Sequence, residues 1–169
     1  MMIHPAMATT SHTHYKDWLD KSLKTLKSFV EKQYINKIDA VTQMFQSEYD
    51  SLKKTYPKIK PLIDLISAMV DEVFNEMNHV VVNGTKDAEK NIDWKATPYW
   101  ILVGGAKLDR GYTIEGLCVT YMPRPLGTSP AADTLQQRAR FFGYKKSYLG
   151  LCRVFVQRNV SDAFTEYVE

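Results

Sequence analysis

Cysteine is scarce in this sequence, and long apolar runs are absent. Only Cys118 and Cys152 occur among 169 residues, each inside an apolar run and without metal-ligand spacing. This pattern excludes a disulfide-rich scaffold and favours two buried free thiols in a reducing compartment over a disulfide. No segment approaches the roughly 18 apolar residues of a membrane span, and the first residues hold too short an apolar run for a signal peptide. We therefore expect a cytoplasmic protein with no membrane partner.

A large excess of one charge is absent, since the net charge is +3 and the pI is about 8.7. Such a mildly basic balance permits contact with nucleic acid without requiring it, and a solvated surface explains it equally well. The hydrophobic fraction of 44% is enough for a core. The length predicts one domain over residues 1–169.

The amino-terminal half carries helical patterns. Apolar side chains recur at three- and four-residue steps from about Ser11 to Lys32, from about Asn36 to Thr55 and from about Lys58 to Met77. Ser11 or Thr13 is the expected N-cap of the first helix. These patterns predict three amphipathic helices in succession.

The carboxyl-terminal half alternates strands with helices. One further short strand is predicted at the amino terminus, in "MMIHPA". Further strands are predicted in "HVVVNG", "YWILVGG", "GLCVTYMPRP" and "LCRVFVQ", and helices in "ADTLQQRARFFGY", from near Asp133, and in the closing "SDAFTEYVE". "YWILVGG" is nearly all apolar, as in a strand buried on both faces of a parallel sheet. The alternation predicts an α/β fold with a mainly parallel sheet flanked by helices.

Four glycines follow the strand "YWILV" or lie close to its loop: Gly104, Gly105, Gly111 and Gly116. Ligands of open parallel sheets bind beyond the carboxyl ends of the strands, and glycines let backbone amides approach a phosphate. The segment has neither a Gly-Lys-Ser/Thr P-loop nor a GxGxxG turn, so it is not a primary triphosphate cradle. A tight connection that simply needs flexible residues is the alternative.

The second feature is "DTLQQRARFFGYKKSY", which interleaves cations and glutamines with aromatic side chains. On a helix, Gln136 and Arg140 lie four residues apart on one face. An arginine held at the carboxyl edge of a sheet is a good donor to a transferring phosphoryl group. An exposed basic helix is the simpler interpretation of this segment alone.

Together the two segments resemble motifs V and VI of the second RecA-like lobe of superfamily-two helicases. They resemble more closely the Z-one domain family, described as candidate endonucleases and found in helicase-like prokaryotic proteins. Its segments have the form GG-x-x-L-x-RG-x-T-x-EGL and Q-x-G-R-x-FGY-R. The matching residues here are Gly104, Gly105, Leu108, Arg110, Gly111, Thr113, Glu115, Gly116 and Leu117, then Gln137, Arg140, Phe142, Gly143 and Tyr144.

The resemblance implies a RecA-like sheet that spans residues 1–169 and carries a helical insertion at 37–77. In such two-lobed ATPases, ATP with Mg²⁺ lies between the lobes, and the first lobe holds the P-loop and the metal-binding acid. This chain resembles only the second lobe. We therefore expect it to be part of a longer protein, to need a partner N-terminal ATPase lobe, and not to hydrolyse ATP alone. Prokaryotic defence systems are the analogous setting.

The resemblance also assigns roles to single residues. Arg140 is the expected arginine finger, with Lys145 as a second cation. Lys107 and Arg124 are candidates for a nucleic-acid track, or else part of a solvated rim. Nucleotide contacts are implied for Gly104, Gly105, Arg110, Gly111, Thr113 and Gln137.

Three positions depart from the family or helicase pattern. Ala139 replaces a glycine, and Lys145 replaces an arginine, which keeps the charge but loses the bidentate fork. Thr113 stands where many helicases carry an aspartate that meets the ribose, so a weaker ribose contact is expected.

No metal site is predicted. Metal-dependent cleavage of nucleic acid needs clustered carboxylates or histidines, but the acids here are scattered and the histidines form only a weak cluster near the amino end. The acids are Asp109, Glu115 and Asp133, and the histidines are His4, His12 and His14. Two alternatives to the ATPase lobe stay open, namely a stand-alone nucleic-acid-binding module and a protein-interaction module that docks through the helices at 37–77.

Overall fold

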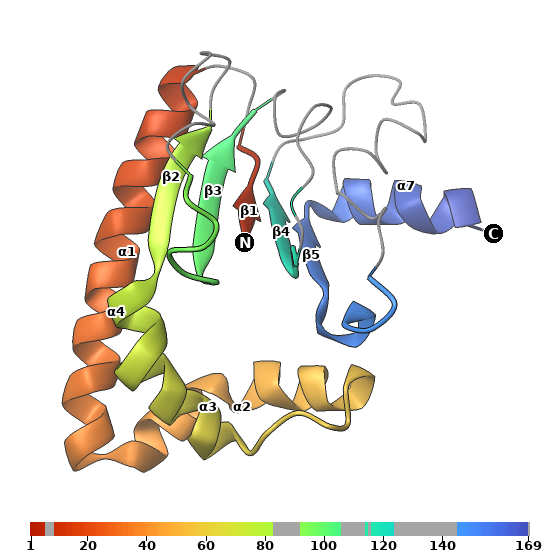
Figure 1. Ribbon diagram of the computed structural model, residues 1–169. Coiled ribbons are helices and arrows are strands. Elements are labelled where there is room, and N and C mark those ends of the chain that lie inside the picture. Colours follow the sequence, from red (N-terminus) through yellow and green to blue (C-terminus); the bar gives the residue numbers. More distant parts are fainter. Residues whose placement is uncertain (6–8, 83–91, 106–113, 115, 124–144, 169) are drawn as a thin grey trace.

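The computed structural model describes residues 1–5, 9–82, 92–105, 114, 116–123 and 145–168. In this part of the chain, parallel strands form one five-stranded sheet in the order β2-β3-β1-β4-β5 (Figure 1). The strands are β1 (Met2–Ile3), β2 (Asn78–Val82), β3 (Trp100–Gly104), β4 (Val119–Met122) and β5 (Arg153–Val156). The predicted α/β class with a parallel sheet is confirmed.

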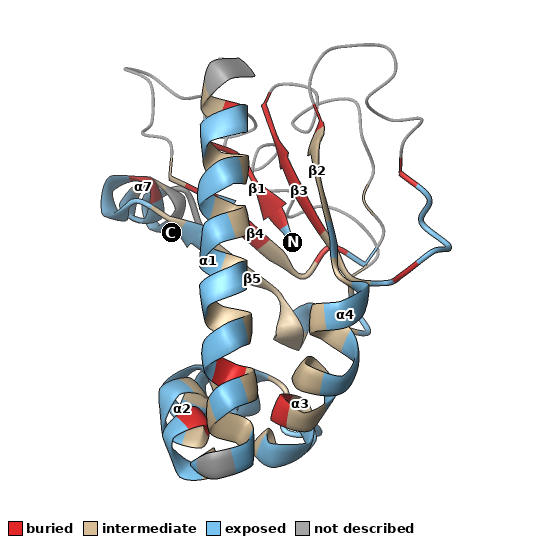
Figure 2. Cartoon of the chain, turned by 90° about the vertical axis from the view of Figure 1, so that its left-hand side faces the viewer, coloured by how far each residue is buried: buried red, intermediate tan, exposed pale blue. Residues whose placement is uncertain are grey.

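The long helix α1 (Thr9–Asn36) covers one face of the sheet (Figure 2). Its side chains Tyr15, Leu19 and Leu23 pack on the buried residues Ile3, Ile101 and Val103. The opposite face has its own core, formed by Met2, Val82 and Leu102 with Ile92 and Leu117 from the connections. Burial on both faces explains why the "WILVG" run is continuously apolar.

The second half of α1 leaves the sheet and enters a small helical bundle, beyond the end of the sheet at which β2 begins (Figure 1). There α1 packs against α2 (Ile38–Thr55) and α3 (Leu62–Ala68). Val30, Val41 and Ile66 form the buried centre of the bundle. These helices occupy the range of the predicted insertion at 37–77.

The third helical segment differs from the prediction in its start and its regularity. It begins at Leu62, directly after Pro61, rather than near Lys58, because a residue that precedes a proline is disfavoured in the helical conformation. It then widens into a π-helical turn, η1 (Met69–Val73), before α4 (Phe74–Glu76). The sequence pattern did not predict the π turn.

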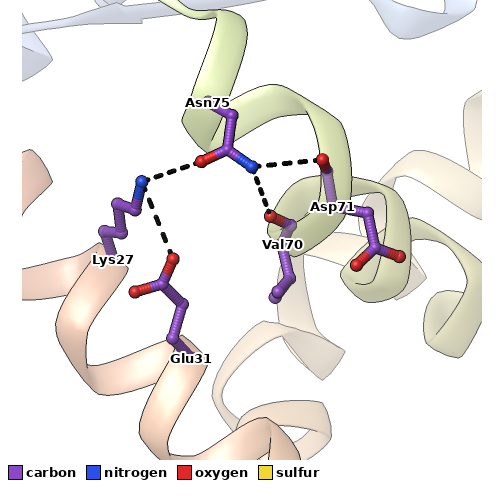
Figure 3. Close-up of polar contacts among 5 residues, drawn as sticks. All are labelled: Lys27, Glu31, Val70, Asp71 and Asn75. Atoms are coloured by element: carbon purple, nitrogen blue, oxygen red, sulfur yellow. Dashed lines mark hydrogen bonds and ion pairs between the residues drawn. The ribbon is translucent and has the colours of Figure 1, made fainter.

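Asn75 stabilises the backbone at this π turn (Figure 3). Its Nδ2 donates to the carbonyl oxygens of Asp71 at 3.2 Å and Val70 at 3.5 Å. Lys27 of α1 donates to the Oδ1 of Asn75 at 3.0 Å and pairs with Glu31 at 3.7 Å. The π turn is therefore tied to α1 through one amide side chain.

Other element boundaries also differ from those predicted. Helix α1 begins at Thr9, so neither Ser11 nor Thr13 is its N-cap. The last helix, α7 (Arg158–Val168), begins three residues before the predicted segment, and the helix predicted from near Asp133 lies outside the described residues. In the described part of the chain, no helix has the length and apolar character to cross a membrane.

The two cysteines are half-buried free thiols, so the prediction that both are buried was wrong. Cys118 lies just before β4 and Cys152 just before β5. Both positions are therefore at the amino edge of the sheet.

Candidate functional site at the carboxyl edge of the sheet

The strand connections run in opposite directions from the two neighbouring strands β1 and β4. The chain leaves β1 through α1 to reach β2 on one side, whereas it leaves β4 to reach β5 on the other side. In open parallel sheets, such a switch point opens a crevice beyond the carboxyl ends of the two strands, where ligands bind. The carboxyl edge at β1 and β4 is therefore the candidate functional site.

His4 and Tyr121 join the two strands at this crevice. The backbone N–H of His4 donates to the carbonyl oxygen of Tyr121 at 2.9 Å, directly after β1 ends. The side chain of His4 is fully buried. The sequence singled out His4 only as part of a histidine cluster, yet the topology places it at the centre of the carboxyl edge.

Gly104 and Gly105 lie at the same edge, at the end of the neighbouring strand β3. Gly104 pairs in register with Val82 of β2, and both glycines are buried. They lead directly into residue 106, so the segment with the Arg110-Gly111 pair is attached to the sheet at its carboxyl edge. The structure thus places both glycines at the end of a strand, and their contact with a ligand stays a prediction.

A second segment also continues from this edge. Met122 ends β4, and Pro123 leads into residue 124. The Nε2 of Gln157, which follows β5, donates to the carbonyl oxygen of Pro123 at 2.7 Å and so joins the ends of the two strands. Gln157 was not predicted as a site residue, since a single glutamine after an apolar strand carries no recognisable signal.

Most of the predicted contact residues lie outside the described residues. These are Lys107, Arg110, Gly111, Thr113, Arg124, Gln137 and Arg140. Their roles stay predictions, supported only by the edge of the sheet to which their segments are joined.

Lys145 lies at the opposite end of the sheet from the glycine pair. Its Nζ donates to the carbonyl oxygen of Leu117 at 2.9 Å, just before β4 begins. At about 3.3 Å per residue, the register places this carbonyl about 15 Å from the level of Gly104 along the strands. The structure thus does not bring Lys145 together with Gly104 and Gly105.

Gly116, the last glycine of the first motif, has a conformational role. Its φ of 70° lies in the left-handed region, and a Cβ there would meet no atom within 4 Å. Glycine adopts this conformation without the steric cost that other residues carry. For this one glycine, the backbone turn alone accounts for the residue type.

The absence of a metal site stays a prediction, because the acids Asp109, Glu115 and Asp133 lie outside the described residues. Among the described side chains, no three histidine, cysteine, aspartate or glutamate residues are grouped as metal ligands would be. His12 is buried on α1, whereas His14 is exposed.

An open parallel sheet with flanking helices defines the described part of the chain as an α/β domain, with the glycine pair buried beside its switch point. The chain belongs to the Z1 domain family, whose model matches residues 1–169. No curated protein and no solved structure gives a significant match.

Proposed function

We propose that this Z1 domain is the second lobe of a helicase-like ATPase that acts on nucleic acid. In this proposal, ATP with Mg²⁺ is held by the P-loop and acidic residues of a separate first lobe. The Z1 domain closes over the nucleotide with its carboxyl edge. Arg140 then donates to the phosphoryl group as charge develops during transfer.

The position of the Gly104–Gly105 pair is the observation that carries this proposal. Both glycines are buried at the end of β3, next to the strand on which the topology reverses. The motif that contains Arg110, Gly111 and Thr113 starts from this point. Backbone amides and a hydroxyl placed there are suited to a nucleotide phosphate or ribose.

The finger role of Arg140 rests on the resemblance of its motif, since Arg140 lies outside the described residues. Its segment continues from Pro123 at the carboxyl edge and returns to described structure at Lys145, at the amino edge. Since Lys145 itself lies at the amino edge, we assign the finger role to Arg140 alone and a structural role to Lys145.

Nucleic-acid contact is proposed through Lys107 and Arg124, which lie next in the chain to the two exits from the carboxyl edge. Two cations near one edge can bind adjacent phosphates.

We place this protein in the cytoplasm, where free thiols such as Cys118 and Cys152 persist. The proposal does not extend to nuclease chemistry, since the acids Asp109, Glu115 and Asp133 are scattered in the sequence.

ATP hydrolysis by the isolated chain tests the division of labour between the lobes. The chain alone should give no turnover, because it supplies no P-loop, and turnover should arise when a P-loop lobe of the same system is added. Turnover by the pure chain that is unaffected by Arg140→Ala would sink the proposal. Nucleic-acid binding that ignores nucleotide and falls steeply with salt would instead favour a stand-alone binding module.

A further inference from the structure

The two cysteines of this chain are neighbours across the β4–β5 pair. Val119 pairs in register with Arg153, and the N–H of Arg153 donates to the carbonyl oxygen of Cys118 at 2.8 Å. Cys118 and Cys152 therefore stand opposite each other, one residue before the first pair of the ladder. Neighbouring strands lie about 4.8 Å apart, which is within the Cα–Cα range of about 4.4 to 6.8 Å that a disulfide spans.

The two sulfur atoms also point to the same small region. The thiol of Cys118 donates to the carbonyl oxygen of Gly116 at 3.3 Å. The thiol of Cys152 lies 3.9 Å from the carbonyl oxygen of the next residue, Leu117, and 3.7 Å from that of Tyr148. The two thiols thus contact consecutive peptide carbonyls, those of Gly116 and Leu117.

A reagent can reach this pair. Both cysteines are only half-buried. Gly116 and Leu117, whose carbonyls contact the thiols, also line a cavity of about 600 Å³ together with Trp94 and Trp100. The dithiol thus lies beside a cavity at the amino edge, away from the carboxyl edge that serves the proposed ATPase role.

Lys145 supplies a positive charge to the same place. Its ammonium group and the Cys152 thiol share the carbonyl oxygen of Leu117, at 2.9 and 3.9 Å. Burial raises the pKa of the Cys118 thiol, and Cys152 raises it further, whereas the amino-terminal ammonium group and, less strongly, Lys145 lower it. A cation beside a thiol pair stabilises the thiolate that forms when one thiol reacts.

We infer that Cys118 and Cys152 form a vicinal dithiol site that closes reversibly to a disulfide by exchange with a low-molecular-weight disulfide. This is a modification site separate from the ATP site, and it does not depend on the proposed ATPase function. The geometry that carries it is the in-register placement of the two residues together with the consecutive carbonyls that their sulfurs contact.

The exchange balances with glutathione disulfide as the oxidant. One protein thiolate attacks a sulfur of glutathione disulfide, which forms a mixed disulfide and releases one glutathione thiolate. The second protein thiolate then attacks the protein sulfur of the mixed disulfide and releases the second glutathione. The two thiol protons end on the two glutathione molecules, so the protein loses two electrons and glutathione disulfide gains them.

Closure of this bond links the ends of the two motif segments. Cys118 follows the first segment, which ends at Leu117, and Cys152 follows the second, which returns at Lys145. A bond between them fixes the start of β4 to the start of β5. The bond would also restrict the backbone next to Arg153, whose guanidinium donates from the start of β5 to the carbonyl oxygen of Ser51 in α2.

The test is exchange of the folded, reduced full chain with glutathione disulfide, followed by alkylation and mass spectrometry. We expect a product that carries no glutathione and no alkyl group, is lighter by two hydrogen atoms, and yields one linked peptide pair containing Cys118 and Cys152. The matched variants Cys118→Ser and Cys152→Ser should stop at a stable glutathione adduct.

Urea provides the control for geometry, because the folded chain should resolve its mixed disulfide faster than the unfolded chain. A wild-type protein that keeps glutathione on one or both cysteines would overturn the inference. So would a folded protein in which both thiols stay open to alkylation, or one that forms the bond only in urea. These results do not require the serine variants to fold.

Discussion

The guanidinium of Arg153 donates to the carbonyl oxygen of Ser51 at 3.0 Å, across 102 positions of the chain. The same group donates to Thr55 Oγ1 at 2.8 Å and to the carbonyl oxygens of Cys152 at 2.8 Å and Gly150 at 3.0 Å. One side chain at the start of β5 thus holds the carboxyl end of α2. Because the helix dipole places partial negative charge at this end of α2, the guanidinium cation is also favoured there electrostatically.

Arg153→Met should detach this end of the helical bundle from the sheet. Methionine retains much of the aliphatic packing but donates no hydrogen bond, and the site is partly exposed, so we expect a loss of about 1–2 kcal/mol in the free energy of unfolding. Urea denaturation measures it. Arg158→Met, at the exposed start of α7, is the matched control, and equal effects of the two changes would contradict the anchoring role.

Gly150 in the short helix η2 (Leu149–Leu151) packs directly on the end of α2. A Cβ at this position would collide with the backbone carbonyl of Thr55, which cannot rotate away as a side chain could. Gly150→Ala should therefore cost about 1–3 kcal/mol in the free energy of unfolding. Thermal unfolding measures it, with the exposed turn residue Ser147→Ala as the control. A neutral Gly150→Ala would show that η2 is not packed against α2.

Asn75→Ala should loosen the π turn between α3 and α4. The change removes the donors to the Val70 and Asp71 carbonyls and leaves Lys27 with Glu31 alone. Because this site is exposed to water, we expect a loss of only about 1 kcal/mol. Amide hydrogen exchange should rise within residues 69–77 and stay unchanged in β3. Uniform acceleration over the whole chain, or none, would count against a local role.

The pKa of Cys118 predicts how stability depends on pH. Burial, and then the neighbouring Cys152, raise it above the ordinary value of 9.0. As pH rises past this value, the unfolded chain releases the thiol proton first, so the reduced protein loses stability in this range and not below it. Cys118→Ser should reduce the downward slope of the urea midpoint above about pH 9. An unchanged or steeper slope in the variant would contradict the assignment.

The strands could be predicted because buried strands consist mainly of apolar residues, which the sequence shows directly. The run from Trp100 to Gly104 is buried or half-buried throughout, and its apolar character predicted a strand in a parallel sheet. The start of α1 could not be predicted as well, because the polar residues Thr9 and Thr10 carry no apolar periodicity. The π turn at Met69–Val73 could not be predicted from the apolar pattern, which does not reveal a local widening of the helix. The contact of Lys27 with Asn75 beside it comes from another helix.

The candidate site was predicted in part. The position of Gly104 and Gly105 at the end of β3 follows from a strand that ends in two glycines, and the structure has them there. The placement of Lys145 could not be read from its motif, since a lysine after a helical pattern can reach either end of the sheet. The pairing of Cys118 with Cys152 depends on the strand order, which no local pattern contains.

The most direct test of the central claim is the effect of Arg140→Ala on nucleic-acid-stimulated ATP hydrolysis. The chain is assayed with the P-loop lobe of its own system, on the same polypeptide or as a separate protein. If Arg140 is the arginine finger, kcat should fall at least about 10³-fold, whereas Arg138→Ala, two residues away at a variable position of the motif, should leave kcat within a factor of about three. Equal activity of the Arg140→Ala and Arg138→Ala proteins would contradict the account.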